Sequence, residues 1–206
     1  SNELFYNGTA MVAQSIVPPG ISGHINGWKN PYREFNVEKA KKLLAEAGYP
    51  GGKGLDEIPY DTSNTTTSRQ MAEFFQKQMA AIGINVKIGT HPFPELQKRI
   101  ATKKGMMYGI AWGADYPDAE NYLSLYYSKN FAPNGPNYTH FKNENFDKIY
   151  EAAYLETDPI LRSQLYTKMD SLVMTSAPIV PLFYDEVVRF TRKNVNGLGI
   201  NATNLL

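Results

Sequence analysis

The feature that most constrains the fold is an alternation of strand-like and helix-like hydrophobic patterns through the middle of the chain. A strand pattern at Ile58–Asp61 is followed by a helical pattern at Ser68–Ile82 and by an alternating strand pattern at Ile84–Ile88. A helix opening near Pro94 and a third strand over Met106–Trp112 continue the series. Strands that alternate with helices favour an α/β fold, so we expect a mixed sheet with flanking helices.

The patterns on either side of this region are mainly helical. Residues 1–36 lack a sustained period and predict an extended lead-in, after which Asn36 is placed to cap a helix over Val37–Ala47. Two more helical patterns and a strand-like tail follow, at Asn145–Glu156, Pro159–Ser176 and Ile179–Val188. No internal repeat appears, and 206 residues are enough for one domain with its own core.

Composition excludes several classes of protein. The 21 Lys and Arg residues against 20 Asp and Glu give a formal charge of +1, so no global field attracts nucleic acid or an anionic membrane. The absence of Cys excludes disulfides and thiol chemistry. No apolar run approaches the roughly 18 residues of a membrane span, and no signal peptide opens the chain. The abrupt start at Glu3 is interpreted as a cut through a longer protein.

Motifs for catalysis, metals and cofactors are missing. The three His residues lie far apart in sequence, and none has a second ligand at a spacing suited to one helix face. The loop Pro50–Gly54 does not meet the Walker pattern, so a solvated turn is favoured over a phosphate cradle. No nucleophile elbow is present. We therefore expect no enzyme activity, no metal and no cofactor.

The most site-like chemistry lies in Ile110–Leu123, where a strand is expected to end and a helix to open at Asp118. Ligands gather beyond the carboxyl ends of strands in α/β sheets. Asp118 is explained as a helix N-cap, which leaves Asp115 as a lone carboxylate that binds a cation or bonds its own backbone. Trp112 is either a ligand contact or a core residue. Several rings surround this loop: Tyr108, Trp112, Tyr116, Tyr122, Tyr126 and Tyr127.

The segment Trp112–Leu123 closely resembles the W-x-A-D-Y-x-D/E-P-x-x-F-L signature of the solute-binding proteins of peptide-type ABC importers, the oligopeptide and dipeptide binders. The resemblance extends over nearly the whole chain in matching order, through Val17–Gly20, Asn36–Pro50, Gln78–Val86, Asn145–Ile149 and Asp158–Leu182. One departure is Ala119, where the family usually has Pro.

The resemblance implies one lobe of a two-lobed, periplasmic-binding-protein-like clamshell, with the N-terminal lobe absent from this sequence. It implies capture of a peptide α-ammonium by Asp115 and side-chain pocket lining by Trp112 and Tyr116. It places main-chain contact with the ligand on Gly109, Ile110, Ala111 and Gly113. Where some relatives carry an Arg for the peptide carboxylate, this chain reads Tyr108-Gly109. Peptide length therefore stays open, as does a nonpeptide ligand.

The function implied by the resemblance is that of a substrate-binding component of a peptide ABC importer. Its expected partners are a peptide, a membrane permease and its own N-terminal lobe, and the expected state is a monomer without nucleic acid. The expected location is extracytoplasmic, as a lipoprotein anchored through the missing N-terminus. Two alternatives remain: a ligand-sensing module of a regulator, and a receptor for a nonpeptide solute such as nickel chelate, haem or oligosaccharide.

Overall fold

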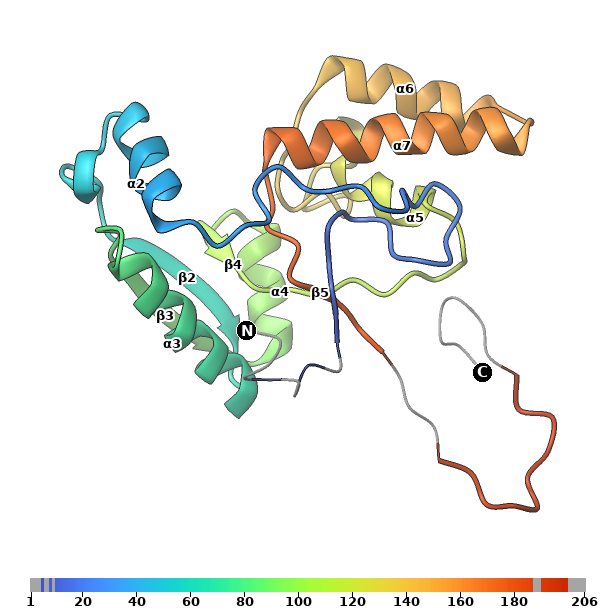
Figure 1. Ribbon diagram of the computed structural model, residues 1–206, viewed down its shortest axis with the longest axis horizontal. Helices are drawn as coiled ribbons and strands as arrows, with labels where there is room; N and C mark the ends of the chain where they lie inside the picture. The colour runs from blue at the N-terminus through green and yellow to red at the C-terminus, as the bar shows by residue number, and fades with distance from the viewer. Residues whose placement is uncertain (1–4, 6–7, 9, 187–189, 200–206) are drawn as a thin grey trace. The chain divides into compact units, whose positions relative to one another are not determined.

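A computed structural model describes residues 5, 8, 10–186 and 190–199 (Figure 1). Contacts between Cα atoms divide the chain into two compact units. Unit 1 comprises Glu34–Ala111, grouped with Ser1, and unit 2 comprises Asn2–Arg33 and Trp112–Leu206. The sequence patterns did not indicate this division, and the assignment of residues 1–206 to one lobe of a longer protein stays a prediction. No helix within the described ranges has the length and apolar character to cross a bilayer.

Unit 1 contains a three-stranded parallel sheet. Strand β2 (Ile58–Ser63) is central, with β3 (Val86–His91) on one side and β4 (Met107–Tyr108) on the other. Helices α3 (Thr66–Ala80) and α4 (Phe93–Ala101) connect these parallel strands and pack against them (Figure 1). The predicted α/β fold with flanking helices is therefore confirmed.

Helix α2 (Val37–Glu46) also belongs to unit 1. The Asn36 side chain accepts a hydrogen bond from the backbone N–H of Lys39, as the predicted cap requires. The sequence also predicts an apolar stripe on this helix, since Val37, Ala40, Leu43, Leu44 and Ala47 recur at helical spacing. The stripe is not covered: no residue of α2 is buried, and Leu43 is 44% exposed.

The glycine-rich loop after α2 forms a short 3-10 turn, Pro50–Gly52. A Cβ atom at Gly52 would lie 1.8 Å from the carbonyl oxygen of Gly83, and both glycines have a positive φ. These glycines therefore permit two backbone segments to approach closely, a structural role that explains the loop without a phosphate ligand.

A buried carboxylate links the elements of unit 1. Asp61 in β2 is 2% exposed, and its Oδ1 lies 2.7 Å from His91 Nε2 at the end of β3. Its Oδ2 accepts from Arg99 Nη2 of α4 at 3.2 Å. A buried charge is tolerated only when it is paired in this way.

Unit 2 is built around a helical hairpin, α6 (Glu144–Leu155) and α7 (Pro159–Ser176), which lie side by side in Figure 1. Asn143 caps α6 and Asp158 caps α7, each by accepting from two backbone N–H groups. The bounds predicted for α7 are confirmed, and those for α6 are one residue later than observed. The buried cluster of this unit consists of Val17, Ile21, Ala119, Leu123, Tyr126, Phe146, Tyr150, Ala153, Tyr166, Met169, Val173 and Met174.

Strand β1 (Met11–Val12) pairs antiparallel with β5 (Phe183–Tyr184) in unit 2. The strand expected over Ile179–Val188 was too long on both sides of β5, because residues 179–182 and 185–186 lie outside the sheet. Pro181 lacks the N–H that a ladder position requires. The end of the predicted strand, residues 187–188, lies outside the described residues.

Two expectations around the candidate site were wrong in extent. The strand predicted over Met106–Trp112 is limited to β4, because only Tyr60 and Asp61 of β2 pair with it. The helix predicted from Asp118 to Tyr127 is α5 (Glu120–Leu123) followed by 3-10 turns at Ser124–Tyr126 and Ser128–Asn130. The Ser124 hydroxyl donates to the carbonyl of Asn121, a local bond that competes with regular helix.

Asp170 on α7 is a fully buried carboxylate in unit 2. Its Oδ1 accepts from the backbone N–H of Ile16 at 3.2 Å, whereas its buried Oδ2 has no hydrogen bond of good geometry within the described residues. Burial raises the pKa of the Asp170 carboxyl from 3.8 to about 6, although hydrogen bonds from the Ser15–Val17 segment and the nearby His24 oppose the shift. At a given pH the Asp170 carboxyl is therefore protonated more often in the folded protein than in the unfolded chain.

We predict that Asp170→Asn changes how stability depends on pH. Because the folded-state pKa is raised, the stabilising contribution of Asp170 is complete below about pH 4 and is lost as pH rises through about 6. Between pH 4 and pH 8 the variant should gain up to about 3 kcal/mol relative to the parent chain. Urea unfolding at both pH values measures this difference. Asp56→Asn, which removes an exposed carboxylate, is the control; an equal gain in both variants would contradict the prediction.

Candidate functional site

The predicted site residues belong to one continuous stretch of sequence, of which Gly109, Ile110 and Ala111 are assigned to unit 1 and the residues from Trp112 onward to unit 2. Gly109 donates its N–H to the carbonyl oxygen of Asp61 at 3.1 Å, which is the last bond that ties this segment to β2. Ile110 and Ala111 end unit 1, and Trp112 opens the second part of unit 2. Residues 109–114 lie outside helices, strands and turns.

The backbone from Ile110 to Gly113 is free for pairing. Within the described part of the chain, none of its N–H or C=O groups has a hydrogen-bond partner. These four residues are exposed, and the Ile110 side chain is 42% exposed. An exposed extended segment with unpaired backbone groups can accept another strand.

Asp115 is an exposed carboxylate without a hydrogen bond or ion pair to any described residue. The alternative in which it bonds its own backbone is therefore not observed. Its neighbour Ala114 is 7% exposed and attaches this part of the loop to the unit. A carboxylate in this setting can pair with an incoming cation without first breaking an internal ion pair.

The rings on either side of Asp115 are anchored to α5. Trp112 is 40% exposed, and its Nε1 donates to Oδ1 of Asn121 at 2.9 Å. Tyr116 is 45% exposed, and its hydroxyl donates to the carboxylate of Glu120. That hydrogen bond, together with burial, raises the pKa of Tyr116. Neither ring is a plain core residue, which leaves both able to contact a ligand.

Asp118 is occupied by structural contacts, as the sequence indicated. Its Oδ1 accepts from the backbone N–H of Glu120 at 2.9 Å, and its Oδ2 lies 3.1 Å from Arg162 Nη2. The helix nevertheless begins two residues later than expected, with Ala119 in the N-cap position. Asp118 is therefore committed to the start of α5 and to α7, whereas Asp115 remains available.

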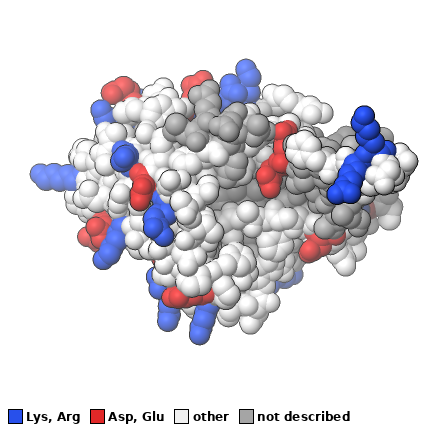
Figure 2. All heavy atoms as spheres, turned by 90° about the horizontal axis from the view of Figure 1, so that it is seen from below, with Lys and Arg blue, Asp and Glu red and all other residues white. Residues whose placement is uncertain are grey.

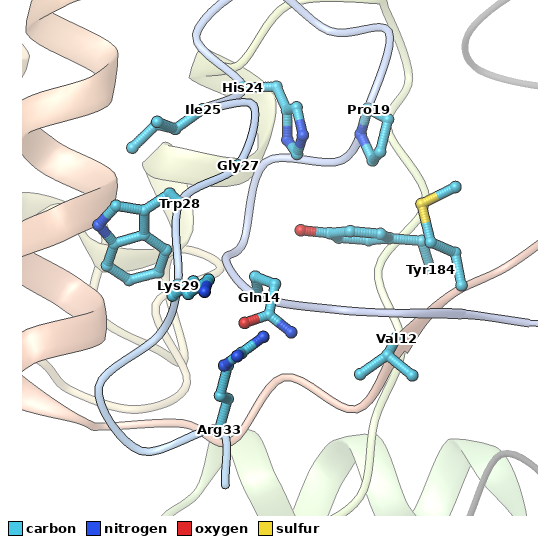
Figure 3. Close-up of a pocket in the computed structure, with 11 residues that line it drawn as sticks. Val12, Gln14, Pro19, His24, Ile25, Gly27, Trp28, Lys29, Arg33 and Tyr184 are labelled. Atoms are coloured by element: carbon cyan, nitrogen blue, oxygen red, sulfur yellow. The ribbon is translucent and has the colours of Figure 1, made fainter.

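A pocket that the sequence did not predict lies within unit 2 and has a volume of about 280 Å³. In Figure 3 the Tyr184 hydroxyl points inward between His24 and Gln14. Lys29 and Arg33 line the same pocket, and both are exposed, so they form a positive rim and not a desolvated anion site. The loop residues of the lead-in supply most of the lining, and loop composition gave no indication that they enclose a pocket. The lining residues are Met11, Val12, Gln14, Pro19, His24, Ile25, Gly27, Trp28, Lys29, Arg33 and Tyr184.

The distribution of charge agrees with the near-neutral composition. Figure 2 shows basic and acidic side chains interspersed over the face in view. Within the described ranges, no group of three or more His, Asp or Glu side chains is arranged to hold a metal ion. Of the three carboxylates in Trp112–Tyr122, Asp118 is paired with Arg162 and Glu120 accepts from two Tyr hydroxyls, which leaves Asp115 as the carboxylate available to a cation.

The sequence of this chain was compared with models of known protein families. Residues 1–134, more than half of the chain, match the family described as bacterial extracellular solute-binding proteins, family 5 Middle. The chain belongs to this family. The predicted resemblance is thereby confirmed, and since the family and the similar proteins are solute-binding proteins, the expectation that the chain is not an enzyme agrees with them.

Two similar proteins show how much of a family member the chain represents. It is 28% identical over 194 residues to the dipeptide-binding protein of Escherichia coli K12, covering 93% of this chain and 36% of that protein. It is 29% identical over 204 residues to the glutathione-binding protein GsiB of Salmonella choleraesuis SC-B67, covering 96% and 39%. The chain thus spans well under half the length of these family members.

Solved structures agree with the fold. The periplasmic binding protein DppA of Helicobacter pylori, in complex with the peptide STSA, has a TM-score of 0.81 and 32% identity, covering 88% of this chain and 35% of that one. The dipeptide-binding protein of Pseudoalteromonas sp. SM9913, in complex with Met-Leu, has a TM-score of 0.76 and 31% identity, covering 88% and 36%. The fold of this chain therefore corresponds to part of the clamshell fold of periplasmic binding proteins.

We predict that two glycines of the site differ sharply in their tolerance of Ala. A Cβ at Gly109 would lie 2.5 Å from the hydroxyl oxygen of the buried Tyr60, whereas Gly113 has no such neighbour within 4 Å. Gly109→Ala should therefore destabilise the chain by about 1–3 kcal/mol, and Gly113→Ala should change stability by less than about 0.5 kcal/mol. Urea unfolding measures both. Equal effects would show that Gly109 is not confined by Tyr60.

Proposed function

We propose that this chain is part of the substrate-binding component of an ABC importer for short peptides. The observation that carries the proposal is the unpaired backbone of Ile110–Gly113, which leads directly to a carboxylate, Asp115, without an internal partner. The similar proteins named for dipeptides and glutathione, and the structures containing STSA and Met-Leu, support a short peptide as the ligand class.

In this proposal the ligand backbone pairs with the Ile110–Gly113 segment as an added strand. Main-chain pairing gives affinity that does not depend on side-chain identity. Gly109 starts this segment from a fixed point, because its N–H remains bonded to β2. Gly113 adds no side chain that could obstruct the peptide.

Asp115 supplies the charged contact. Its carboxylate pairs with the peptide α-ammonium in a charge-assisted hydrogen bond, and the rings of Trp112 and Tyr116 line the adjoining side-chain pocket. The exposed, unpaired Asp115 supports a cationic group at this end of the ligand, whereas Asp118 is already paired with Arg162. The proposal includes no chemical step, since the ligand is held and released unchanged.

The remainder of the protein completes the assembly that we propose. A second lobe supplies the other contacts to the peptide and excludes water from it, and a membrane permease receives the ligand. We place the whole protein outside the cytoplasm as a lipid-anchored monomer, in agreement with the extracellular character of the family.

We predict that Asp115→Ala, in the protein that includes both lobes, selectively weakens binding of peptides with a free amino group. Loss of a hydrogen bond to a charged group should reduce affinity by about tenfold to a hundredfold. The N-acetylated form of the same dipeptide should be affected much less, because it has no ammonium to lose. Calorimetry of both ligands measures the difference, with Asp56→Ala as the charge-matched control. Equal losses for both ligands would remove the ammonium role.

We also predict that the 206-residue chain alone folds but binds dipeptide only weakly. The chain alone makes only some of the contacts to the peptide, and no second lobe excludes water from the bound peptide. The dissociation constant should therefore exceed about 100 µM. Titration of the chain followed by nuclear magnetic resonance measures this range. A dissociation constant of about 1 µM or lower would show that the second lobe is not needed.

A further inference from the structure

The first turn of α5 holds both exposed rings of the candidate site. Asn121 is 6% exposed, yet its Oδ1 accepts from the indole N–H of Trp112, a ring that is itself 40% exposed. A buried acceptor that binds an exposed ring restricts the rotation of that ring. Core packing does not require this bond, because much of the indole lies outside the core.

Glu120 anchors the second ring from a fixed position. One carboxylate oxygen accepts from the Tyr116 hydroxyl, and the other accepts from Tyr150 on α6. Tyr150 is 8% exposed and stacks on Tyr127 with 4.4 Å between the ring centroids. The carboxylate is therefore held on its core side, so that it can fix Tyr116 on the solvent side.

The helix itself is rigidly seated. Ala119 and Leu123, which flank these two residues in sequence, are both fully buried in the core of unit 2. Consecutive residues of a helix point about 100° apart, so Glu120 and Asn121 direct their side chains to different parts of the preceding loop. Glu120 reaches Tyr116, and Asn121 reaches Trp112 and also interacts with the Tyr116 hydroxyl. Asp115 lies between those two rings in sequence with no bond of its own.

We propose that Asn121 and Glu120 are positioning residues that preorganise Trp112 and Tyr116 for a peptide ligand. This inference rests on the proposed function, since it assigns the rings as ligand contacts. Rings fixed before binding lose little rotational freedom when the ligand arrives, so affinity is gained without an additional contact. Neither positioning residue needs to touch the ligand.

The first experiment tests the positioning of Trp112 without any ligand. The chain has two Trp residues, so Trp28→Phe assigns the indole N–H resonances in a nitrogen–proton correlation spectrum of the 206-residue chain. In Asn121→Ala the Trp112 resonance should shift and its N–H should exchange faster with solvent. Asn121→Asp keeps an acceptor at the same atom and should restore protection, which also covers the case in which the Ala variant folds poorly. An unchanged Trp112 resonance in the Ala variant, or unrestored protection in the Asp variant, would overturn the proposal.

The second experiment asks whether positioning affects binding, and it uses the protein with both lobes and an unmodified dipeptide. Asn121→Ala should weaken binding by about threefold to tenfold. In a Trp112→Ala background the same change should have a clearly smaller effect, because the indole that Asn121 holds is gone and only its interaction with Tyr116 remains. Full additivity of the two changes would overturn the proposal. If Trp112→Ala alone leaves affinity unchanged, the Trp112 ring is not a ligand contact, and that part of the proposed function is wrong. The indole N–H spectrum still tests, independently of any ligand, whether Asn121 positions the ring.

A parallel pair tests the second ring. Glu120→Gln replaces the carboxylate that accepts a hydrogen bond from the Tyr116 hydroxyl with a neutral amide, which weakens that bond. In the parent background this change should weaken dipeptide binding by about threefold to tenfold. In a Tyr116→Phe background, which lacks the hydroxyl, the same change should have little effect. Equal losses in both backgrounds would show that Glu120 acts on the ligand or on the fold and not through Tyr116.

Discussion

The structure of unit 1 depends on one buried carboxylate in the middle of its central strand. Asp61 joins three elements, since its side chain pairs with His91 of β3 and Arg99 of α4 while its backbone carbonyl accepts from Gly109. Removing one partner of such a buried pair leaves an uncompensated charge, which costs several kcal/mol, roughly 3–5. Asp61, which carries this buried charge, therefore also fixes, through its backbone carbonyl, the point from which the candidate ligand-binding segment leaves the sheet.

The helices could be predicted from sequence because their determinants are local. Asp158 with Pro159 specified the start of α7 by side-chain capping and a proline at the first turn, and no distant residue was needed. The apolar stripe of α2 is the counterexample. Its period was correct, yet Leu43 remains exposed, because periodicity shows which face is apolar and not whether a partner covers it.

Strand length and helix length near the site could not be predicted in the same way. The pattern of Met106–Trp112 suits a strand, but the length of a strand is set by the pairs that it forms, and this segment pairs only with Tyr60 and Asp61 although β2 continues to Ser63. The candidate residues themselves were identifiable, since Trp112 and Asp115 carry recognisable chemistry. The anchors of the rings were not, because Asn121 and Glu120 in sequence are ordinary residues of a helical turn and only their hydrogen bonds distinguish them.

Ala119 shows how the departure from the family pattern is accommodated. Its φ of −62° is close to the value of about −65° that proline fixes. Its N–H donates to no described residue, whereas its carbonyl accepts from Tyr122 and Leu123. The backbone here is thus in a conformation that a proline could adopt without losing a hydrogen bond, and Ala reaches it through burial of its methyl group in the core of unit 2. The start of α5, and with it the placement of Glu120 and Asn121, is therefore set by packing and by the Asp118 carboxylate, and a proline is not required.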